Sequence, residues 1–150
     1  MANTAARALH ILIADDETAV AQSLEIVLRY AGHRIEAVSD GKQAHDRLTA
    51  KAADFDLLIT DDAMPILTGL QLVQKLHAAK FPGKILVLSA CLSPDREQAY
   101  REIGVDHILH KPFDIAPLRL VVEQSEPHLI LSPSLEDSFP TLFLRRTTDA

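Results

Sequence analysis

Apolar and polar positions follow two alternating patterns along this chain. Short extended runs are each followed by a stretch in which apolar residues recur every three or four positions, the spacing of a helix with one buried face. After the first run, for example, Val20, Leu24 and Val27 share a helical face, and Gly32 is placed to end the helix. The pattern repeats five times, and the predicted strands are Leu9–Ala14, His33–Val38, Phe55–Thr60, Ile85–Leu88 and Asp106–His110.

Capping residues mark where the predicted helices begin. Asp40 can cap the second helix, whose face carries Ala44, Leu48 and Ala52, and Asp114 can cap the fifth. The other helices show their apolar faces at Leu70, Val73 and Leu76 in the third, at Ala99 and Ile103 (after Ser93 and Pro94) in the fourth, and at Leu118, Val121 and Val122 in the fifth.

This alternation predicts an α/β fold in which a five-stranded parallel sheet carries helices on both faces, joined by right-handed crossovers. The central strands are almost continuously apolar, as expected where both faces of a sheet are buried. The fifth strand, Asp106–His110, is shorter and more polar and therefore suits an edge. The 150 residues fit one domain, which we place at residues 1–125.

Residues 126–150 depart from this pattern. Three prolines interrupt the segment too often for a long helix, yet the runs Leu129–Leu131 and Leu142–Leu144 are too apolar for a plain linker. We expect a C-terminal tail or the start of a linker, with no output domain. The alternative is a segment that docks on this domain, on a second copy or on a partner.

Composition excludes several classes of function. The net charge is −6, from 15 basic and 21 acidic residues, and no run of Lys and Arg could follow a phosphate backbone, so direct nucleic-acid binding is not expected. The single cysteine, Cys91, rules out an internal disulfide and fits a reducing compartment. No apolar stretch has the length of a membrane helix, and residues 1–8 do not resemble a secretory signal. We therefore expect a cytoplasmic protein that does not contact the membrane.

Candidate chemistry lies at the ends of the predicted strands. Asp15 and Asp16 follow the first strand and Asp61 follows the third, while Ser89 and Lys111 follow the fourth and fifth. Because the carboxyl ends of parallel strands meet at one edge, where ligands bind, these polar groups are expected to converge. Two carboxylates 4 Å apart repel by about 4 kcal/mol at an effective dielectric of about 20. A hard cation such as Mg²⁺ relieves that repulsion and accepts a phosphate oxygen as a further ligand.

Taken together, these residues resemble the receiver domain of two-component response regulators, of the chemotaxis-regulator type. The resemblance covers about residues 8–124 and implies the flavodoxin-like strand order 2-1-3-4-5. The matching features, in order, are Asp15-Asp16, Asp61 four positions before Pro65, Gly69, Ser89-Ala90 and Lys111-Pro112-Phe113.

The resemblance also implies a metal site. In the family an acidic pair and an acceptor aspartate hold Mg²⁺, with help from the backbone carbonyl two residues after the acceptor. On this chain the carbonyl belongs to Ala63. Asp16 and Asp61 would then bind the metal directly, and Asp15 would act largely through water.

By the same resemblance, Asp61 is the nucleophile that accepts a phosphoryl group. Lys111 would neutralise charge on the transferring oxygens, and Ser89 would donate its hydroxyl to one of them. The peptide bond between Lys111 and Pro112 is expected to be cis.

Adjacent aspartates leave a choice of acceptor. Strand alternation points Asp61 and Asp62 to opposite sides, and the spacing to Pro65 selects Asp61. Asp62 is the alternative if the register at the strand end differs. A separate departure from the family is Ile108, three positions before the lysine, where many receivers carry an aromatic residue. Ile108 has neither a ring nor a hydroxyl, so the usual aromatic switch is in doubt.

Each candidate residue also has a purely structural interpretation. Asp15 and Asp16 could cap the first helix, Ser89 could be an ordinary strand-end hydroxyl, and Lys111 could be a solvated surface lysine. These explanations account for the residues one at a time, but not for their occurrence at four strand ends of one sheet.

The resemblance implies a phosphorylation-controlled switch rather than an enzyme, with a histidine kinase or a histidine phosphotransfer protein as donor and an unidentified downstream protein as target. A homodimer could form through the fourth helix, fifth strand and fifth helix, or through the tail. One alternative is a Mg²⁺-dependent aspartyl-phosphate phosphohydrolase, which would need an Asp-x-Asp signature where this chain has adjacent aspartates. Others are a flavodoxin-like nucleotide binder, which Asp15-Asp16-Glu17 would repel, and a degenerate receiver that acts only as an interaction module.

Overall fold

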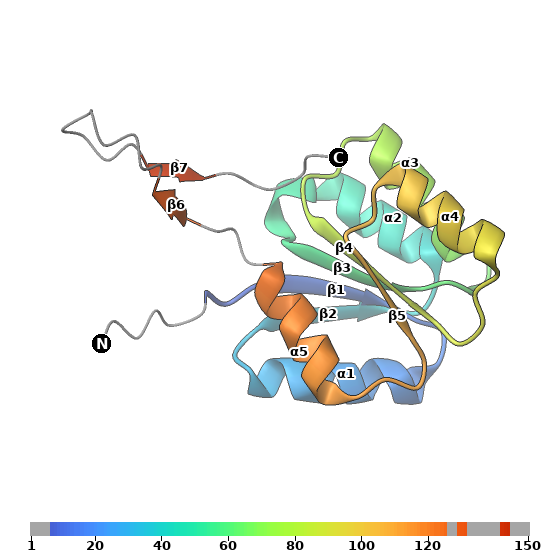
Figure 1. Ribbon diagram of the computed structural model, residues 1–150, viewed down its shortest axis with the longest axis horizontal. Helices are drawn as coiled ribbons and strands as arrows, with labels where there is room; N and C mark the ends of the chain where they lie inside the picture. Colours follow the sequence, from blue (N-terminus) through green and yellow to red (C-terminus); the bar gives the residue numbers. More distant parts are fainter. Residues whose placement is uncertain (1–6, 126–128, 132–141, 145–150) are drawn as a thin grey trace.

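The computed structural model describes residues 7–125 and two short strands beyond them. Its centre is a five-stranded parallel sheet in the order β2-β1-β3-β4-β5 (Figure 1). The predicted five-stranded parallel sheet and its order are therefore confirmed. The strands are β1 (His10–Ala14), β2 (Arg34–Val38), β3 (Leu57–Asp61), β4 (Lys84–Ser89) and β5 (His107–His110).

Helices cover both faces of this sheet (Figure 1). Ile11 and Ile13 of β1 point into a core shared with α1 and α5, whereas Leu12 and Ala14 point into a second core shared with α2, α3 and α4. Alternate residues of one strand thus feed two separate apolar layers, as a doubly wound sheet requires. The helices are α1 (Thr18–Tyr30), α2 (Gly41–Ala50), α3 (Gly69–Ala78), α4 (Pro94–Ile103) and α5 (Ile115–Gln124), with a short 3₁₀ turn at Ala52–Asp54.

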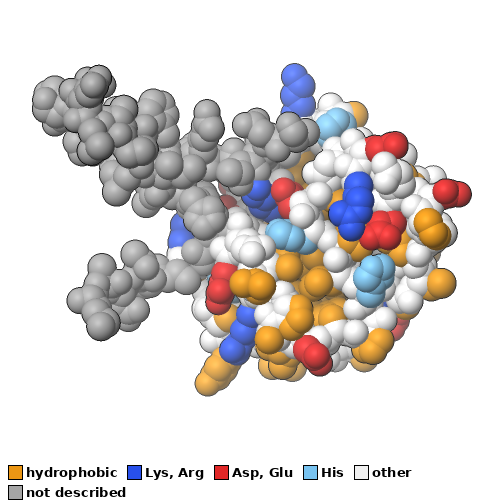
Figure 2. Space-filling view, in the orientation of Figure 1, with side chains coloured by type: hydrophobic (Ala, Val, Ile, Leu, Met, Phe, Trp, Pro, Cys, Tyr) orange, Lys and Arg blue, Asp and Glu red, His pale blue; other side chains and the backbone are white. Residues whose placement is uncertain are grey.

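The central strand β3 and the edge strand β5 differ in burial. All five residues of β3 are buried, but no residue of β5 is. Figure 2 shows apolar side chains gathered on the face where β5 lies between α4 and α5. The prediction that the fifth strand forms an edge is confirmed, because β5 pairs only with β4 in the sheet.

Some predicted element boundaries are wrong by a few residues. Ala52 was expected on the buried face of the second helix, but α2 ends at Ala50 because Lys51, with φ −140° and ψ 55°, leaves the helical region. Phe55 was expected to begin the third strand, yet β3 begins at Leu57. Phe55 is nevertheless fully buried, and its ring stacks on that of His10 at 4.2 Å between centroids.

Of the predicted caps Asp40 and Asp114, only Asp40 forms a side-chain capping hydrogen bond. Asp40 accepts a hydrogen bond from the backbone N–H of Gln43 at 2.7 Å and caps α2 as expected. Asp114 occupies the N-cap position of α5, but its side chain makes no capping hydrogen bond. Its backbone has the extended conformation of a cap, so the helix begins where predicted without that bond.

Both apolar runs of the tail form strands. β6 (Leu129–Leu131) pairs antiparallel with β7 (Leu142–Leu144), with Ile130 opposite Phe143. Most of residues 126–150 lie outside the described part of the chain, and so does the prediction that this tail docks on the domain or on a partner. Among the helices that are described, none is long and apolar enough to cross a bilayer.

Candidate functional site

Strand register brings the predicted site residues to one edge of the sheet. Ala14 lies opposite Thr60, so Asp15, directly after β1, and Asp61, the last residue of β3, each come one residue later. Ser89, the last residue of β4, lies opposite His110, which directly precedes Lys111. The backbone N–H of Lys111 donates to the Ser89 carbonyl at 2.8 Å and extends this pairing by one residue.

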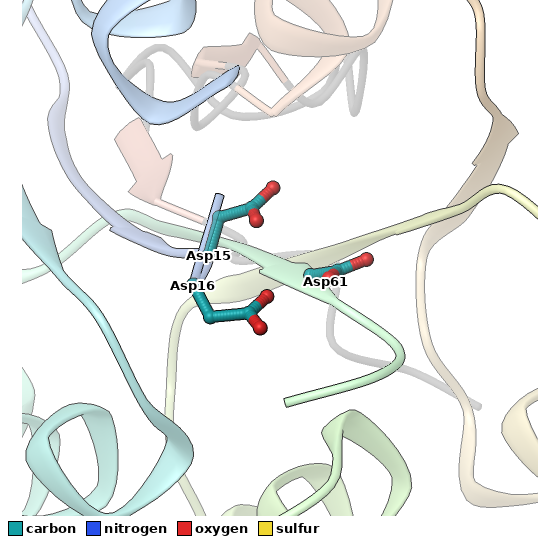
Figure 3. A group of neighbouring side chains, drawn as sticks. All are labelled: Asp15, Asp16 and Asp61. Carbon is teal, nitrogen blue, oxygen red and sulfur yellow. The ribbon is translucent and has the colours of Figure 1, made fainter. Parts of the chain in front are cut away.

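Three carboxylates meet at this edge. Asp15, Asp16 and Asp61 each offer one oxygen, and these oxygens lie within 4.8 Å of one another. Figure 3 shows the three side chains pointing to the same side from the ends of β1 and β3. Asp15 and Asp61 are buried, whereas Asp16 is exposed. The cluster is therefore reached from solvent on the Asp16 side.

Lys111 supplies the neighbouring positive charge. Its Nζ lies 3.1 Å from Asp15 Oδ2 and 3.3 Å from Asp61 Oδ1, and 3.9 Å from Glu17 Oε1. Only 12% of the lysine side chain is exposed, so the predicted alternative of a solvated surface lysine is wrong. Burial opposes the charge on this ammonium, but the hydrogen bond to Asp15 and the charges of Asp15 and Asp61 hold the pKa of Lys111 above its ordinary value.

The position of Asp61 changes the pKa of its carboxyl group. Burial, followed by the charge of Asp15, raises the pKa of Asp61 to about 6, although Lys111 works in the opposite direction. The backbone N–H of Asp62 also donates to Asp61 Oδ1 at 3.0 Å, which favours the ionised form. At neutral pH Asp61 is mainly a carboxylate, the form that a nucleophile or metal ligand needs.

The donor set fits a hard divalent cation. Three carboxylate oxygens close together suit Mg²⁺, which prefers oxygen ligands and keeps several waters, and the exposed Asp16 leaves room for them. Ala63 is exposed in the loop after β3. A metal ligand role for Ala63 is compatible with this position and stays a prediction.

Asp15 also stabilises the start of α1, the structural role considered for it from the sequence. Its Oδ1 accepts a hydrogen bond from the backbone N–H of Glu17 at 2.9 Å, at the start of α1. Its Oδ2 faces Lys111, so one carboxylate serves the helix start and the site together. The peptide bond between Lys111 and Pro112 is cis, as expected.

The remaining predicted residues lie beside this cluster. Ser89 is buried at the end of β4, one residue past Leu88, which pairs with Asp61. Its placement suits a hydroxyl donor to a group on Asp61, a role that stays a prediction. Cys91, two residues further, is exposed on the following loop.

Asp62 points away from the cluster, as strand alternation predicted. Its carboxylate instead accepts hydrogen bonds from the Tyr100 hydroxyl and from Arg96, both on α4. Sequence reasoning missed Tyr100, because the apolar face of the fourth helix was assigned to Ala99 and Ile103. Tyr100 is the buried residue of that helix, and its spacing of three residues from Ile103 was the available signal.

Comparison with known proteins agrees with this geometry. Residues 11–123 match the family model of the response regulator receiver domain. The chain is 34% identical over 110 residues to response regulator RppA of Synechocystis and 32% identical over 123 residues to response regulator MprA of Mycobacterium avium. The matches cover 73% and 79% of this chain but 47% and 53% of those relatives, so the chain spans about half their length.

Solved structures give the same answer. Chemotaxis protein CheY4 of Vibrio cholerae superposes with a TM-score of 0.71 at 29% identity, covering 79% of this chain and 99% of that one. The receiver domain of the Francisella response regulator 1452 superposes with a TM-score of 0.71 at 28% identity, covering 78% and 95%.

A doubly wound sheet with an acidic cluster and a largely buried lysine at its carboxyl edge defines the class of protein. The chain belongs to the response regulator receiver domain family of two-component signalling. Receiver domains are signalling modules for which phosphorylation and Mg²⁺ are characteristic.

Proposed function

We propose that Asp61 accepts a phosphoryl group from a histidine kinase or a histidine phosphotransfer protein. The single observation that carries this proposal is the position of Asp61, within 4.8 Å of both other carboxylates and 3.3 Å from Lys111. Asp15 is also buried and near Lys111, but its Oδ1 accepts the Glu17 N–H and its Oδ2 faces Lys111, whereas both hydrogen bonds described for Asp61 go to Oδ1. Asp62 is a poor acceptor because its oxygen is already bonded to Tyr100 and Arg96.

The residues present would hold Mg²⁺ through Asp16, Asp61 and the Ala63 carbonyl, with Asp15 largely acting through water. When bound, the metal supplies positive charge that neutralises the oxygens of the transferring phosphoryl group. Lys111 provides a second positive charge 3.3 Å from Asp61 Oδ1, and its contact with Asp15 keeps its side chain in place. Phosphoryl transfer needs mainly positioning and charge neutralisation, and this edge offers both.

In the transfer, an Asp61 carboxylate oxygen forms a bond to phosphorus while the bond between phosphorus and the donor histidine nitrogen breaks. The electron pair of that bond returns to the imidazole, and Asp61 becomes an aspartyl phosphate. Ser89 is placed to donate its hydroxyl to a phosphoryl oxygen. Later attack by water on phosphorus would return the carboxylate and release phosphate, which is autodephosphorylation rather than turnover of a substrate.

The modified form would act through a protein surface. The partly buried β5, with the apolar side chains between α4 and α5, is the surface we assign to a downstream protein or to a second copy of this chain (Figure 2). The tail is the alternative dimer contact. Direct binding of nucleic acid is not proposed, because the net charge is −6. A cytoplasmic location stays a prediction.

Two other functions have less support. A phosphohydrolase would require an Asp-x-Asp signature, but Asp15 and Asp16 are adjacent. A degenerate receiver that acts only as an interaction module would not need three converging carboxylates and a largely buried lysine.

The test is an intact-mass measurement of the full chain after incubation with acetyl phosphate and Mg²⁺. We expect the mass of one phosphoryl group to be added to the wild type and to be lost on mild alkaline treatment. The Asp61→Asn variant should gain nothing, while Asp62→Asn should still be modified. Modification of Asp61→Asn at the wild-type level would overturn the assignment, and continuous release of phosphate far beyond the protein concentration would favour the phosphohydrolase.

A further inference from the structure

A second buried carboxylate lies directly behind the proposed acceptor. Asp62 is 4% exposed, and its Oδ1 accepts hydrogen bonds from the Tyr100 hydroxyl at 2.5 Å and from Arg96 Nη2 at 2.9 Å. Arg96 and Tyr100 are one turn apart on α4, so both hydrogen bonds tie the same helix to the end of β3. We call Asp62, Arg96 and Tyr100 the α4 anchor.

Tyr100 holds the anchor more firmly than Arg96 does. The Tyr100 side chain is fully buried, and burial together with the Asp62 charge raises the pKa of its hydroxyl, which therefore remains a donor. The Arg96 side chain is 40% exposed, and its buried Nε has no hydrogen-bond partner in the described part of the chain. The Arg96 guanidinium is thus only partly hydrogen-bonded. Loss of the Tyr100 bond would leave the buried Asp62 Oδ1 with Arg96 as its remaining donor.

The backbone of Asp62 connects this anchor to the phosphoryl site. Its N–H lies 3.0 Å from Asp61 Oδ1 and 3.0 Å from the carbonyl of Leu88, the residue before Ser89. Its carbonyl accepts the N–H of Gly69 at 2.8 Å, where α3 begins. A side chain at Gly69 would collide with the Asp61 carbonyl and the Tyr100 hydroxyl, so these groups pack closely against the start of α3.

We propose that the α4 anchor couples phosphorylation of Asp61 to the packing of α4, an inference that rests on the function proposed above. A free Asp61 carboxylate is a charged acceptor for the Asp62 N–H. In the aspartyl phosphate the oxygen not bonded to phosphorus is a neutral carbonyl, and neutral acceptors form hydrogen bonds about half as strong. One of the two hydrogen bonds made by the Asp62 N–H therefore weakens, while the bond to the Leu88 carbonyl remains, and we expect the change at residue 62 to loosen α4.

This route is independent of β5. Ile108 packs in the same apolar layer as Tyr100, but its side chain has no polar group that could form a hydrogen bond to the phosphoryl site. Tyr100 instead brings an aromatic hydroxyl into that layer from α4 and bonds it to the residue next to the acceptor. The signal would thus reach the α4 surface through the end of β3.

The experiment compares the wild type with Tyr100→Phe, which removes only the hydroxyl. Beryllofluoride with Mg²⁺ serves as a noncovalent analogue of the phosphoryl group, and amide hydrogen exchange is followed in residues 94–104. In the wild type, beryllofluoride should speed exchange there by about fivefold, the factor that corresponds to ~1 kcal/mol for one hydrogen bond. Tyr100→Phe should already exchange faster without the probe and respond little to it.

Thermodynamic linkage makes the affinity for beryllofluoride a second test, because a purely structural role of Tyr100 would leave that affinity unchanged. If beryllofluoride weakens the anchor, removal of the anchor must tighten beryllofluoride binding by the same factor, about fivefold here. Asp62→Asn should shift exchange and affinity in the same directions. Tyr30→Phe, at an exposed position of α1, and Arg101→Ala, on the outer face of α4, are the matched controls and should behave as the wild type.

An unchanged beryllofluoride affinity and an unchanged exchange response in Tyr100→Phe would overturn the coupling. So would a wild type that binds beryllofluoride without any change in α4. If the wild type neither binds beryllofluoride nor gains a phosphoryl group from acetyl phosphate, the proposed function fails first and the coupling falls with it.

Discussion

At the residue scale, Asp61 carries opposing demands. Its carboxylate is useful for chemistry when ionised, yet burial and the Asp15 charge both disfavour ionisation and raise its pKa to about 6. Lys111 offsets only part of this, because the same ammonium also serves Asp15. Without a bound cation, the ionised site therefore destabilises the fold.

The sign of the resulting pH dependence follows from linkage. The pKa of Asp61 in the folded state, about 6, lies above its ordinary value of 3.8, so the folded protein binds more protons between these values. The free energy of unfolding thus falls as the pH rises from about 4 to about 6, and the loss is complete above that range. Asp61→Asn removes the titrating group, so in EDTA it should raise stability at pH 7.5 by about 1–3 kcal/mol and have little effect near pH 4.

Urea unfolding of both proteins at several pH values measures this difference. Asp16→Asn is the control, because Asp16 is exposed and should change stability far less. A stabilisation by Asp61→Asn that is equal at pH 4 and pH 7.5 would contradict the electrostatic explanation.

At the scale of the elements, sequence predicts where helices begin better than how they are capped. Asp40 and Asp114 have the same side chain at the same helical position, and both cap residues were identified from residue type alone. Only Asp40 turns its carboxylate to the helix backbone. Residue preference predicts the position of a cap but not the rotamer of its side chain.

A pair of substitutions tests this contrast. Asp40→Ala removes the 2.7 Å bond to the Gln43 N–H and should lower the free energy of unfolding by about 1 kcal/mol. Asp114→Ala removes no capping bond and should cost a few tenths of that at most. Thermal unfolding of the two variants beside the wild type measures both effects, and equal losses would show that the Asp114 carboxylate acts at the start of α5 after all.

At the scale of the whole molecule, the order of the strands was implied by the resemblance to receiver domains, and the convergence of Asp15, Asp61 and Lys111 was predictable because parallel strands place their carboxyl ends together. The α4 anchor was not. Asp62 lies 34 residues from Arg96 and 38 from Tyr100, and their pairing depends on how α4 packs on the sheet rather than on any local pattern. The pairing of β6 with β7 was missed for a different reason, since the prolines between the two apolar runs argued for a linker.

Cation binding should be visible as a change in global stability. A ligand that binds only the folded state stabilises it by about 2.7 kcal/mol at 100 times its Kd. Mg²⁺ should therefore raise the Tm of the wild type, and Asp15→Asn or Asp61→Asn should abolish most of that rise because each removes a clustered carboxylate. Asp46→Asn, at an exposed pair with Lys42 on α2, should leave the Mg²⁺ response intact. A rise of the same size in Asp61→Asn would place the cation elsewhere.

The exposure of Cys91 has a practical consequence. It is the chain's single thiol and lies on the loop two residues beyond Ser89, so a maleimide dye can be attached at one defined place without mutagenesis. A fluorophore there would sit close to the edge where the carboxylates meet, and its emission would report in real time on movement of that loop.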